Sequence, residues 1–328
     1  MDVPVRTVEP GRRAKPISIT LASYALLMIL ILLIIVFSLV ERSTFPTSRT
    51  LVTLLRTESV SAILAIALIF PLIVGEFDLS VGANLGLGAI LVTGLSSQQG
   101  LPLVASLVIA VLATTVVGLI NGLLIASVGI NALVATLGTS VIVSGAVLWY
   151  TGGNVFYTNI PTDLPKLAQE NFLGIPLPAF LLAIVAIAAW YTLDHTPLGR
   201  YLYAIGGSKD AARLSGINVR RLTVLAFVIA GVLAGFAGVL QSAQLGSGNP
   251  NVGPPFLLPA FASAFLGATA IRVGTFNVLG TILAVFTVAV GITGLQLLGA
   301  PFFMAPIFQG GALLVAVAAA RFLRLEQL

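Results

Sequence analysis

Two carboxylates, Glu76 and Asp78, are the only charged residues between Ser59 and Tyr150. An ionised side chain among so many apolar residues is costly, and by default it indicates a ligand-binding site or a proton carrier. Asp78 also stands two residues before Ser80, where an apolar segment resumes, so its carboxylate could cap a helix and favour the helix dipole. We favour capping and gating, because both carboxylates lie near the end of an apolar segment.

Five polar amides lie within or beside apolar segments, where each could do one of two things. Their hydrogen-bonding groups could line a passage for an uncharged solute such as a sugar, or they could bond neighbouring helices to each other. Together with the two carboxylates they form our candidate gating or pathway set. The amides are Asn84, Asn121, Asn131, Gln241 and Gln244.

Most catalytic and cofactor chemistries are excluded by residues that the sequence lacks. It has no cysteine and a single histidine, His195, which rules out disulfides, thiolate metal sites and histidine clusters. No GxxxxGK(S/T) phosphate loop occurs, and none of the lysines (Lys15, Lys166 and Lys209) follows a glycine. We therefore expect a protein that is not an enzyme, holds no metal or cofactor, and does not bind ATP through that motif.

The composition indicates which elements must position these residues. Hydrophobic residues make up 58% of the 328 residues and charged residues 8%, with a mean hydropathy of +1.09, whereas soluble domains carry about 25% charged residues. The chain is therefore predicted to be an all-α integral membrane protein. A helix crosses a bilayer with about 20 apolar residues, which predicts about ten spans, near 17–40, 51–73, 80–97, 102–127, 131–150, 177–193, 222–243, 256–271, 274–297 and 303–322.

Basic residues set the expected orientation of these spans, with both termini in the cytoplasm. The basic residues on the cytoplasmic side would be Arg6, Arg12, Arg13, Lys15, Arg200, Lys209, Arg213, Arg220, Arg221, Arg272, Arg321 and Arg324, and those outside would be Arg42, Arg49, Arg56 and Lys166. This asymmetry explains the net charge of +5 better than nucleic-acid binding does. We expect a cytoplasmic tail at 1–16, one transmembrane domain at 17–322 and a second cytoplasmic tail at 323–328.

The two halves of the chain resemble each other weakly. NGLLIASVG at 121–129 corresponds to TGLQLLGAP at 293–301, and at a similar offset GEFDLSVG at 75–82 corresponds to GSGNPNVG at 246–253. Because the related helices are an odd number of spans apart, such repeats would have opposite topology, which is typical of transporters. Chance similarity between Gly-rich apolar segments is the alternative.

The stretch AIGGSKDAARLSGINVRR at 204–221 is unusually polar for this chain. Ser208 is a suitable N-cap and Gly216 a suitable C′ residue, which predicts a helix of about two turns between them. So short a helix is marginal in water unless it docks against something. The small residues that would let another backbone approach it are Ala211, Ala212 and Ser215. The simpler alternative is a loop whose arginines only fix the topology.

The same stretch resembles the cytoplasmic motif of ABC-transporter permeases of the ribose, galactose, arabinose and xylose uptake type. GEFDLSVGA at 75–83 resembles a second motif of that family, and VATLGTSVIVSG at 134–145 resembles a third region. The resemblance runs from about residue 50 to 320, with the spacing between motifs preserved. Two departures stand out. The family usually has glycine-isoleucine where this chain has Glu76–Phe77, and a Gly-rich run where it reads LGATAIRVGTFN at 266–277.

This resemblance implies a type II-like importer permease with a 5+5 inverted repeat, in which 204–221 is a coupling helix that sits in a cleft of the ATP-hydrolysing subunit. The implied coupling residues are Ser208, Lys209, Asp210, Ala211, Ala212, Arg213, Leu214, Ser215, Gly216 and Ile217. The implied partners are an ABC ATP-binding subunit that carries ATP and Mg, a periplasmic or lipid-anchored sugar-binding protein, a second identical or related permease, and membrane lipid, with no nucleic acid. The implied location is the bacterial inner membrane.

Monosaccharide import is the expected function, and two alternatives remain. The departures leave open an ABC permease for another small solute, such as a branched-chain amino acid, a nucleoside or a furanosyl signal. An ion-coupled secondary transporter would require a titratable site at mid-membrane, for which we identify only Glu76 and Asp78. The outer stretch 151–176 is either a plain connector or part of the surface that docks the binding protein.

Overall fold

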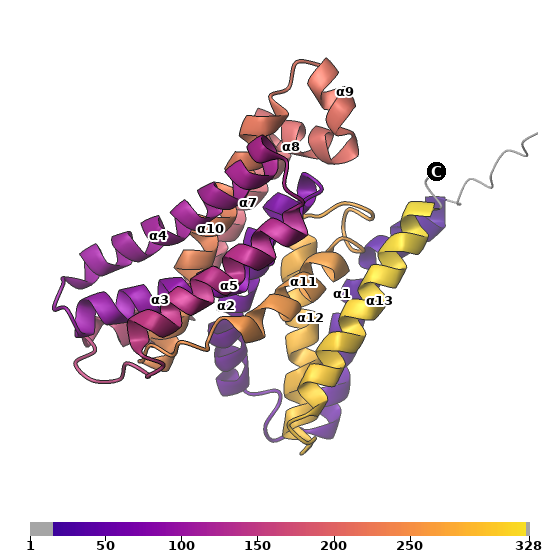
Figure 1. Cartoon of the computed structure of the whole chain (residues 1–328). Coiled ribbons are helices and arrows are strands. Elements are labelled where there is room, and N and C mark those ends of the chain that lie inside the picture. The colour runs from indigo at the N-terminus through magenta and orange to yellow at the C-terminus, as the bar shows by residue number, and fades with distance from the viewer. Residues whose placement is uncertain (1–15, 326–328) are drawn as a thin grey trace, which may run out of the picture.

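All ten predicted apolar segments become helices. The structure is a computed structural model, and it describes residues 16–325. Apart from one short hairpin, every named element among these residues is a helix (Figure 1). The elements are α1 (Pro16–Val40), α2 (Ser48–Ile73), α3 (Val81–Ser97), α4 (Leu103–Leu123) with a π-helical extension η1 (Leu124–Val128), α5 (Ala132–Thr151), α6 (Asp163–Gln169), β1 (Asn171–Phe172), β2 (Ile175–Pro176), α7 (Leu177–His195), α8 (Pro197–Gly207), α9 (Lys209–Leu214), α10 (Val219–Leu245), η2 (Pro254–Phe256), α11 (Leu257–Gly267), α12 (Val278–Leu297) and α13 (Met304–Leu325).

Seven helices in the described part of the chain are long and apolar enough to cross a membrane. They are α1, α2, α4 with η1, α5, α7, α10 and α12. The other three apolar helices, α3, α11 and α13, offer shorter apolar stretches, and two of them are the Gly- and Pro-broken segments of the sequence. The predicted all-α, multi-span architecture is confirmed. The tails predicted at 1–16 and 323–328 lie outside the described residues, except that Pro16 begins α1 and residues 323–325 end α13.

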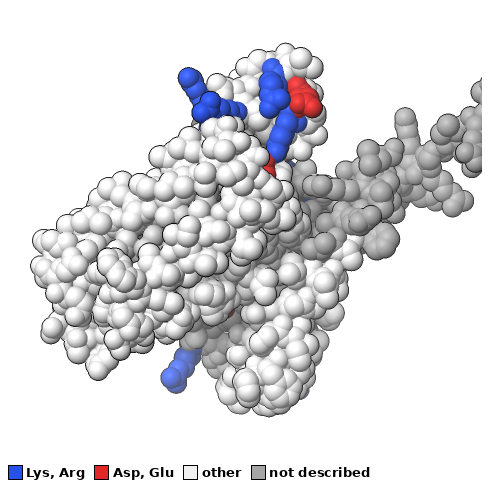
Figure 2. All heavy atoms as spheres, in the orientation of Figure 1, with Lys and Arg blue, Asp and Glu red and all other residues white. Residues whose placement is uncertain are grey.

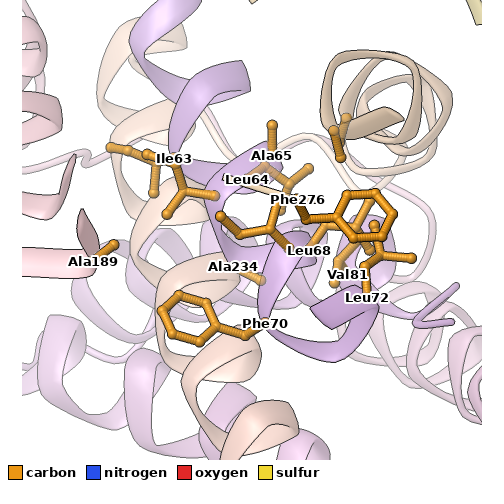
Figure 3. Packing of buried hydrophobic residues seen from close by; sticks show 14 of the residues in the cluster. Ile63, Leu64, Ala65, Leu68, Phe70, Leu72, Val81, Ala189, Ala234 and Phe276 are labelled. Atoms are coloured by element: carbon orange, nitrogen blue, oxygen red, sulfur yellow. The ribbon is translucent and has the colours of Figure 1, made fainter. Parts of the chain in front are cut away.

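Helix α2 lies at the centre of the molecule. Every residue from Ser59 to Ile73 except Ser61 is buried, as expected for a helix that is apolar on all sides. It packs against α7, α10, α11 and α12. Figure 3 shows its large side chains among Ala189 of α7, Ala234 of α10 and Phe276, which precedes α12. Such a helix can transmit a displacement to most of the others.

Glycines let α10 approach α3 and α4 closely. A Cβ atom added at Gly118 of α4 would lie 2.3 Å from the carbonyl oxygen of Phe227, and one at Gly235 of α10 would lie 2.0 Å from Oγ1 of Thr114. A Cβ atom at Gly88 of α3 would lie 2.6 Å from the Gly235 carbonyl oxygen. The glycines of GVLAGFAG and GLING therefore serve helix packing, as their spacing predicted.

The helix contacts follow the predicted repeat. Helix α10 packs against α3 and α4, and α2 correspondingly packs against α11 and α12; α3 contacts α4 and α5, and α11 contacts α12 and α13. Exchanging α2 with α10, α3 with α11, α4 with α12 and α5 with α13 therefore reproduces these pairs. The first helices of the two halves do not follow this exchange. Helix α1 packs on α12, whereas α7 packs on α2.

The two halves run in opposite directions. The Gln244 side-chain amide, at the end of α10, donates to the Arg56 carbonyl oxygen in the first half of α2 (2.6 Å). Near the other end, Lys209 just before α10 pairs with Glu76 just after α2. Helices α2 and α10 are therefore antiparallel, as an inverted repeat requires.

The two polar breaks, 75–82 and 246–253, have matching local structure. Each begins with a glycine of positive φ and contains an Asx turn, at Gly75 (+81°) and Asp78 in the first and at Gly246 (+61°) and Asn249 in the second. The breaks also meet, since a Cβ atom at Gly253 would lie 2.1 Å from the Gly82 carbonyl oxygen. The faint sequence similarity therefore reflects real structural correspondence at the centre of the fold.

The stretch 266–277 departs most from the predicted boundaries. Helix α11 ends at Gly267 and α12 begins at Val278, whereas the predicted helices reached 271 and began at 274. The cause is Asn277, whose Oδ1 caps α12 by accepting from the Gly280 N–H (2.7 Å) while its Nδ2 donates to the Gly267 and Ala270 carbonyl oxygens (3.3 and 3.1 Å).

Three elements were not predicted from the sequence. The stretch 151–176 contains the short helix α6 and the antiparallel β1–β2 hairpin, and its role as a connector or as a docking surface stays a prediction. Helix α8 includes residues 204–207, so the polar insert begins with the last turn of a helix rather than with a loop. Helix α8 therefore leads directly into α9, which projects at one end of the molecule (Figure 1).

Candidate functional site

Helix α9 forms where capping residues predicted it. The Ser208 hydroxyl accepts a hydrogen bond from the Ala211 N–H (3.2 Å), which satisfies one of the free amides at the helix start. After Leu214 the chain reverses at Gly216, whose φ is +81°, and the Ile217 N–H donates to the Ala212 carbonyl oxygen (3.0 Å). Ile217 is half-buried against the core. Hydrogen-bonded caps at both ends, together with the packing of Ile217 on the core, thus fix where this helix begins and ends.

The outward face of α9 differs from the predicted one. Ala212 is buried against the permease itself (3% exposed), so it does not belong to a small-residue face for a partner; Ala211 and Ser215 do remain exposed. Leu214, one of the implied coupling residues, is 90% exposed. Ala211, Leu214 and Ser215 therefore lie on the exposed side of this helix.

Charged side chains gather at this end of the molecule. Figure 2 shows Lys and Arg side chains with an acidic neighbour around α9. The rest of the visible face, which the long apolar helices form, is almost free of charged residues. Asp210 and Arg213 form an ion pair on the exposed surface of the helix (3.3 Å). Arg220, at the start of α10, donates to the Ser127 hydroxyl on η1 (2.6 Å). The insert is therefore fixed to α4 and α10 as well as to α8.

Two predicted residues that are far apart in the sequence meet here. Lys209 of α9 forms an ion pair with Glu76, which follows α2. The Glu76 side chain is 15% exposed and the Lys209 side chain 44%, so the contact is partly shielded from water. This pair links the coupling segment to the first polar break, and the departure at Glu76 supplies the carboxylate.

Asp78 lies in a buried hydrogen-bond network. Its Oδ1 accepts from the Ser80 N–H (2.9 Å) and from the Ser80 hydroxyl (2.6 Å) at the start of α3. The Asn121 amide of α4 donates to that hydroxyl oxygen (2.8 Å), and the Thr139 hydroxyl of α5 donates to Asn121 Oδ1 (2.7 Å). Asp78 therefore forms an Asx turn onto Ser80, the N-cap residue of α3, and makes no side-chain cap of the helix itself. Through Ser80 and Asn121 this network ties three helices together.

Thr136 of α5 secures the same break from the other side. The Leu79 N–H donates to its hydroxyl oxygen (3.0 Å), and the hydroxyl lies within hydrogen-bonding reach of the Phe77 carbonyl oxygen (3.4 Å). Thr136 and Thr139 both belong to the region that resembles the third family motif. We did not assign them a role from the sequence, although their spacing of three residues places them on one helix face.

The remaining amides have structural partners. Asn84 donates to the Thr114 carbonyl oxygen of α4 (3.3 Å), while exposed Asn131 caps α5 by accepting from the Leu133 and Val134 N–H groups (3.0 and 3.4 Å). Gln244 bonds α10 to α2, and Gln241 is half-buried. Helix bonding and capping thus account for Asn84, Asn121, Asn131 and Gln244, and a pathway role for any of them stays a prediction.

Phenylalanines connect the first break to α11. The Phe77 ring stacks on Phe261 and Phe265, with centroid distances of 6.2 and 6.3 Å, and Phe265 meets Phe276 edge-on at 5.4 Å. Phe77 is part of the departure from the family pattern. The aromatic residue at this position therefore contacts the second half of the molecule directly.

The loop at 266–277 is held to α7 and α8. Arg272 donates to Asp194 at the end of α7 (2.6 Å), and the Tyr203 hydroxyl of α8 donates to the Phe276 carbonyl oxygen (2.8 Å). Burial and the nearby Asp194 raise the pKa of Tyr203 to about 12, which keeps its hydroxyl protonated as a donor. Both ends of the α8–α9 segment are thus anchored to the transmembrane core.

Known proteins resemble this chain over nearly its whole length. The Ribose import permease protein RbsC of Haemophilus influenzae is 34% identical over 302 residues, which cover 91% of this chain and 93% of the relative. RbsC of Escherichia coli is 32% identical over 311 residues (94% and 96%), and the D-allose transport system permease protein AlsC of Escherichia coli is 30% identical over 320 residues (97% and 98%). No solved structure matches the chain significantly.

A family model agrees with these relatives. The model described as branched-chain amino acid transport system / permease component matches residues 50–317. This range contains both polar breaks, the coupling segment and nine of the ten apolar helices, from α2 to most of α13. The chain therefore belongs to this family of transport-system permease components.

Proposed function

We propose that this protein is the membrane-spanning permease subunit of an ATP-driven ABC importer for a monosaccharide. The relatives named for ribose and D-allose support a sugar as cargo, in preference to the branched-chain amino acids of the family description. Hydrolysis of ATP is left to a partner subunit that carries ATP and Mg, and this chain has no catalytic role.

The observation that carries the proposal is the geometry of α9. Its inner side is fixed by buried Ala212 and by the Lys209–Glu76 pair, while its outer side presents Leu214 to solvent. A helix held in this way can enter a cleft of an ATPase and pass its movement inward. Moving a two-state equilibrium from 1:99 to 99:1 takes about 5.5 kcal/mol of differential binding, which a packed helix can supply and a single exposed salt bridge of about 0–1 kcal/mol cannot.

The cycle then follows from alternating access. Closure of two ATPase subunits on ATP draws the α9 helices together, and the pathway between two permease copies changes its open side. A periplasmic or lipid-anchored binding protein delivers the sugar, and α6 with the β1–β2 hairpin forms part of its docking surface. The α9 end faces the cytoplasm of a bacterial inner membrane, with both termini on that side.

Co-purification of an ATPase tests this proposal. Ala212→Pro removes the hydrogen bond from the Ala212 N–H to the Ser208 carbonyl oxygen (3.0 Å) and should release the ATP-binding subunit while membrane insertion persists. Asp210→Pro is the matched control, because proline is tolerated in the first turn of a helix. The proposal is wrong if no ATPase accompanies the unmodified chain and uptake follows an ion gradient instead.

A further inference from the structure

A large cavity opens at the end of the molecule away from α9. It has a volume of ≈ 890 Å³ and lies between the loop after α1, the first half of α2, η2, α11, α12 and the start of α13. Helix α2 is about 39 Å long, at 1.5 Å per residue over 26 residues, and its far end carries the Glu76 link to α9. The cavity therefore opens on the opposite side of the permease from the coupling helix.

One wall of the cavity is a row of hydroxyl groups on α2. Thr47, Thr50, Thr53 and Thr57 recur every three or four residues, which places them on one helix face. Across the cavity α12 contributes Thr293 and Gln296. Three of the threonine hydroxyls already donate to backbone carbonyl oxygens, Thr47 and Thr50 to Thr44 and Thr57 to Thr53. Their oxygens can still accept hydrogen bonds from a ligand with many hydroxyl groups.

The charges lining the cavity balance. Arg49 stands near its mouth and Glu58 lies deeper, where it hydrogen-bonds with Ser61. One positive and one negative lining residue favour an uncharged polar solute over an anion or a cation. A partly buried carboxylate that can accept from two hydroxyls at once is also a strong partner for a vicinal diol.

The residues that line the cavity differ in their burial. Thr53 and Thr57 are exposed, Ser61 is half-buried, and Ser263 of α11 at the floor is buried (4% exposed). Beyond Ser61 the α2 residues are all buried as far as Ile73. The site is thus accessible from one end and closed toward α9, with a volume inside the usual range of about 300–1,000 Å³ for small-molecule pockets.

We propose that this cavity within a single protomer is a binding site for the transported monosaccharide, with Glu58 and the α2 threonines as its hydroxyl-binding groups. The proposal rests on the proposed function and adds a location for the cargo in each chain.

Cysteine protection tests the site, because the sequence contains no cysteine. Thr57→Cys, in cells that express the complete transporter, should react with a membrane-impermeant thiol reagent added outside. A panel of aldopentoses and aldohexoses should include a sugar that slows this reaction about tenfold at ten times its Kd, following simple occupancy. Ser59→Cys, on the buried side of α2, should not react, and Asn154→Cys, exposed at the same end, should react without protection.

The outcomes separate the site from the proposed function. A Thr57→Cys protein that does not react from outside, or reacts unprotected by a sugar that the same cells import, overturns the cavity site and leaves sugar import standing. If the cells show no ATP-dependent uptake of any monosaccharide, the proposed function is wrong. As a second measurement, Glu58→Gln should lower uptake of the protecting sugar at least tenfold while the ATPase still co-purifies; unchanged uptake overturns the role of Glu58.

Discussion

Breaking the ion pair between Lys209 and Glu76 should uncouple ATP hydrolysis from transport. The pair joins α9 to the break that follows α2, and α2 packs against α7, α10, α11 and α12 among other helices. Removing it leaves α9 attached through Ala212 and Ile217, so the helix should still form and still dock. What is lost is the direct connection to the centre of the bundle.

The size of the effect follows from the exposure of the two side chains. Fully exposed ion pairs contribute about 0–1 kcal/mol, and hydrogen bonds to charged groups about 1.5–3 kcal/mol. With Glu76 at 15% and Lys209 at 44% exposure, the pair lies between these limits, at about 1–2 kcal/mol. That energy corresponds to about a 5- to 30-fold change in the equilibrium that the pair biases.

A double-mutant cycle measures this energy. Glu76→Gln, Lys209→Met and the double variant are compared for sugar transported per ATP hydrolysed, in proteoliposomes that contain the complete transporter. The ratio of sugar transported to ATP hydrolysed should fall by about the same factor in each single variant. In the double variant it should fall little further, which gives a coupling energy of about 1–2 kcal/mol. The exposed pair Asp210–Arg213 on the same helix is the control, where Asp210→Asn and Arg213→Met should couple by less than about 0.5 kcal/mol.

Additive losses would refute this reasoning. If the two single effects sum in the double variant, the residues act separately and the pair carries no signal. Equal coupling energies at Lys209–Glu76 and at Asp210–Arg213 would show that the net charge of α9, rather than its link to the break, matters to the ATPase.

Three further changes have definite expected results. Gly216→Val places a β-branched residue at a φ of +81°, which introduces about 1–3 kcal/mol of backbone strain. This strain should impair the stimulation of ATP hydrolysis by the binding protein, and unaltered stimulation would contradict the role of this turn. Gly235→Ala pushes a methyl group against Thr114 and should lower the thermal unfolding temperature in detergent, whereas Gly207→Ala, with nothing within 4 Å, should not. Asn121→Leu removes the donor to the Ser80 hydroxyl oxygen and the acceptor for the Thr139 hydroxyl, and it should cost about 1–3 kcal/mol of stability in a denaturant titration; wild-type stability would show that the network is dispensable.

The spans and the short coupling helix were predictable because their signals are local. Each apolar run of membrane length becomes a helix, and Ser208 with Gly216 bounds α9 closely. Even the inverted repeat was detectable, since the two polar breaks keep their glycines and Asx residues. Helix α8 was not predicted, although Pro197 at its start and the spacing of its buried residues Leu202 and Ile205 are local signs of an amphipathic helix.

The contacts between distant residues could not be read from local patterns. Glu76 and Lys209 are 133 residues apart, and Asp78 finds its partners on α4 and α5 only after the helices pack. The cavity did leave a signal, because threonines recur every three or four residues along α2 and end beside Glu58. We interpreted α2 only as a span, and we did not assign a role to the polar face of its first half.

The first break lies between α9 and the cavity that we propose as the sugar site, and its neighbouring residues make separate contacts. Glu76 binds α9, Phe77 stacks on Phe261 and Phe265 of α11, and Asp78 holds α3, α4 and α5 through Ser80 and Asn121. Ser263, between those two phenylalanines, lines the floor of the cavity. A shift of α9 can thus reach that floor through two contacts. With Glu76 paired and Asp78 hydrogen-bonded within the protein, these carboxylates are better suited to transmitting force than to carrying an ion.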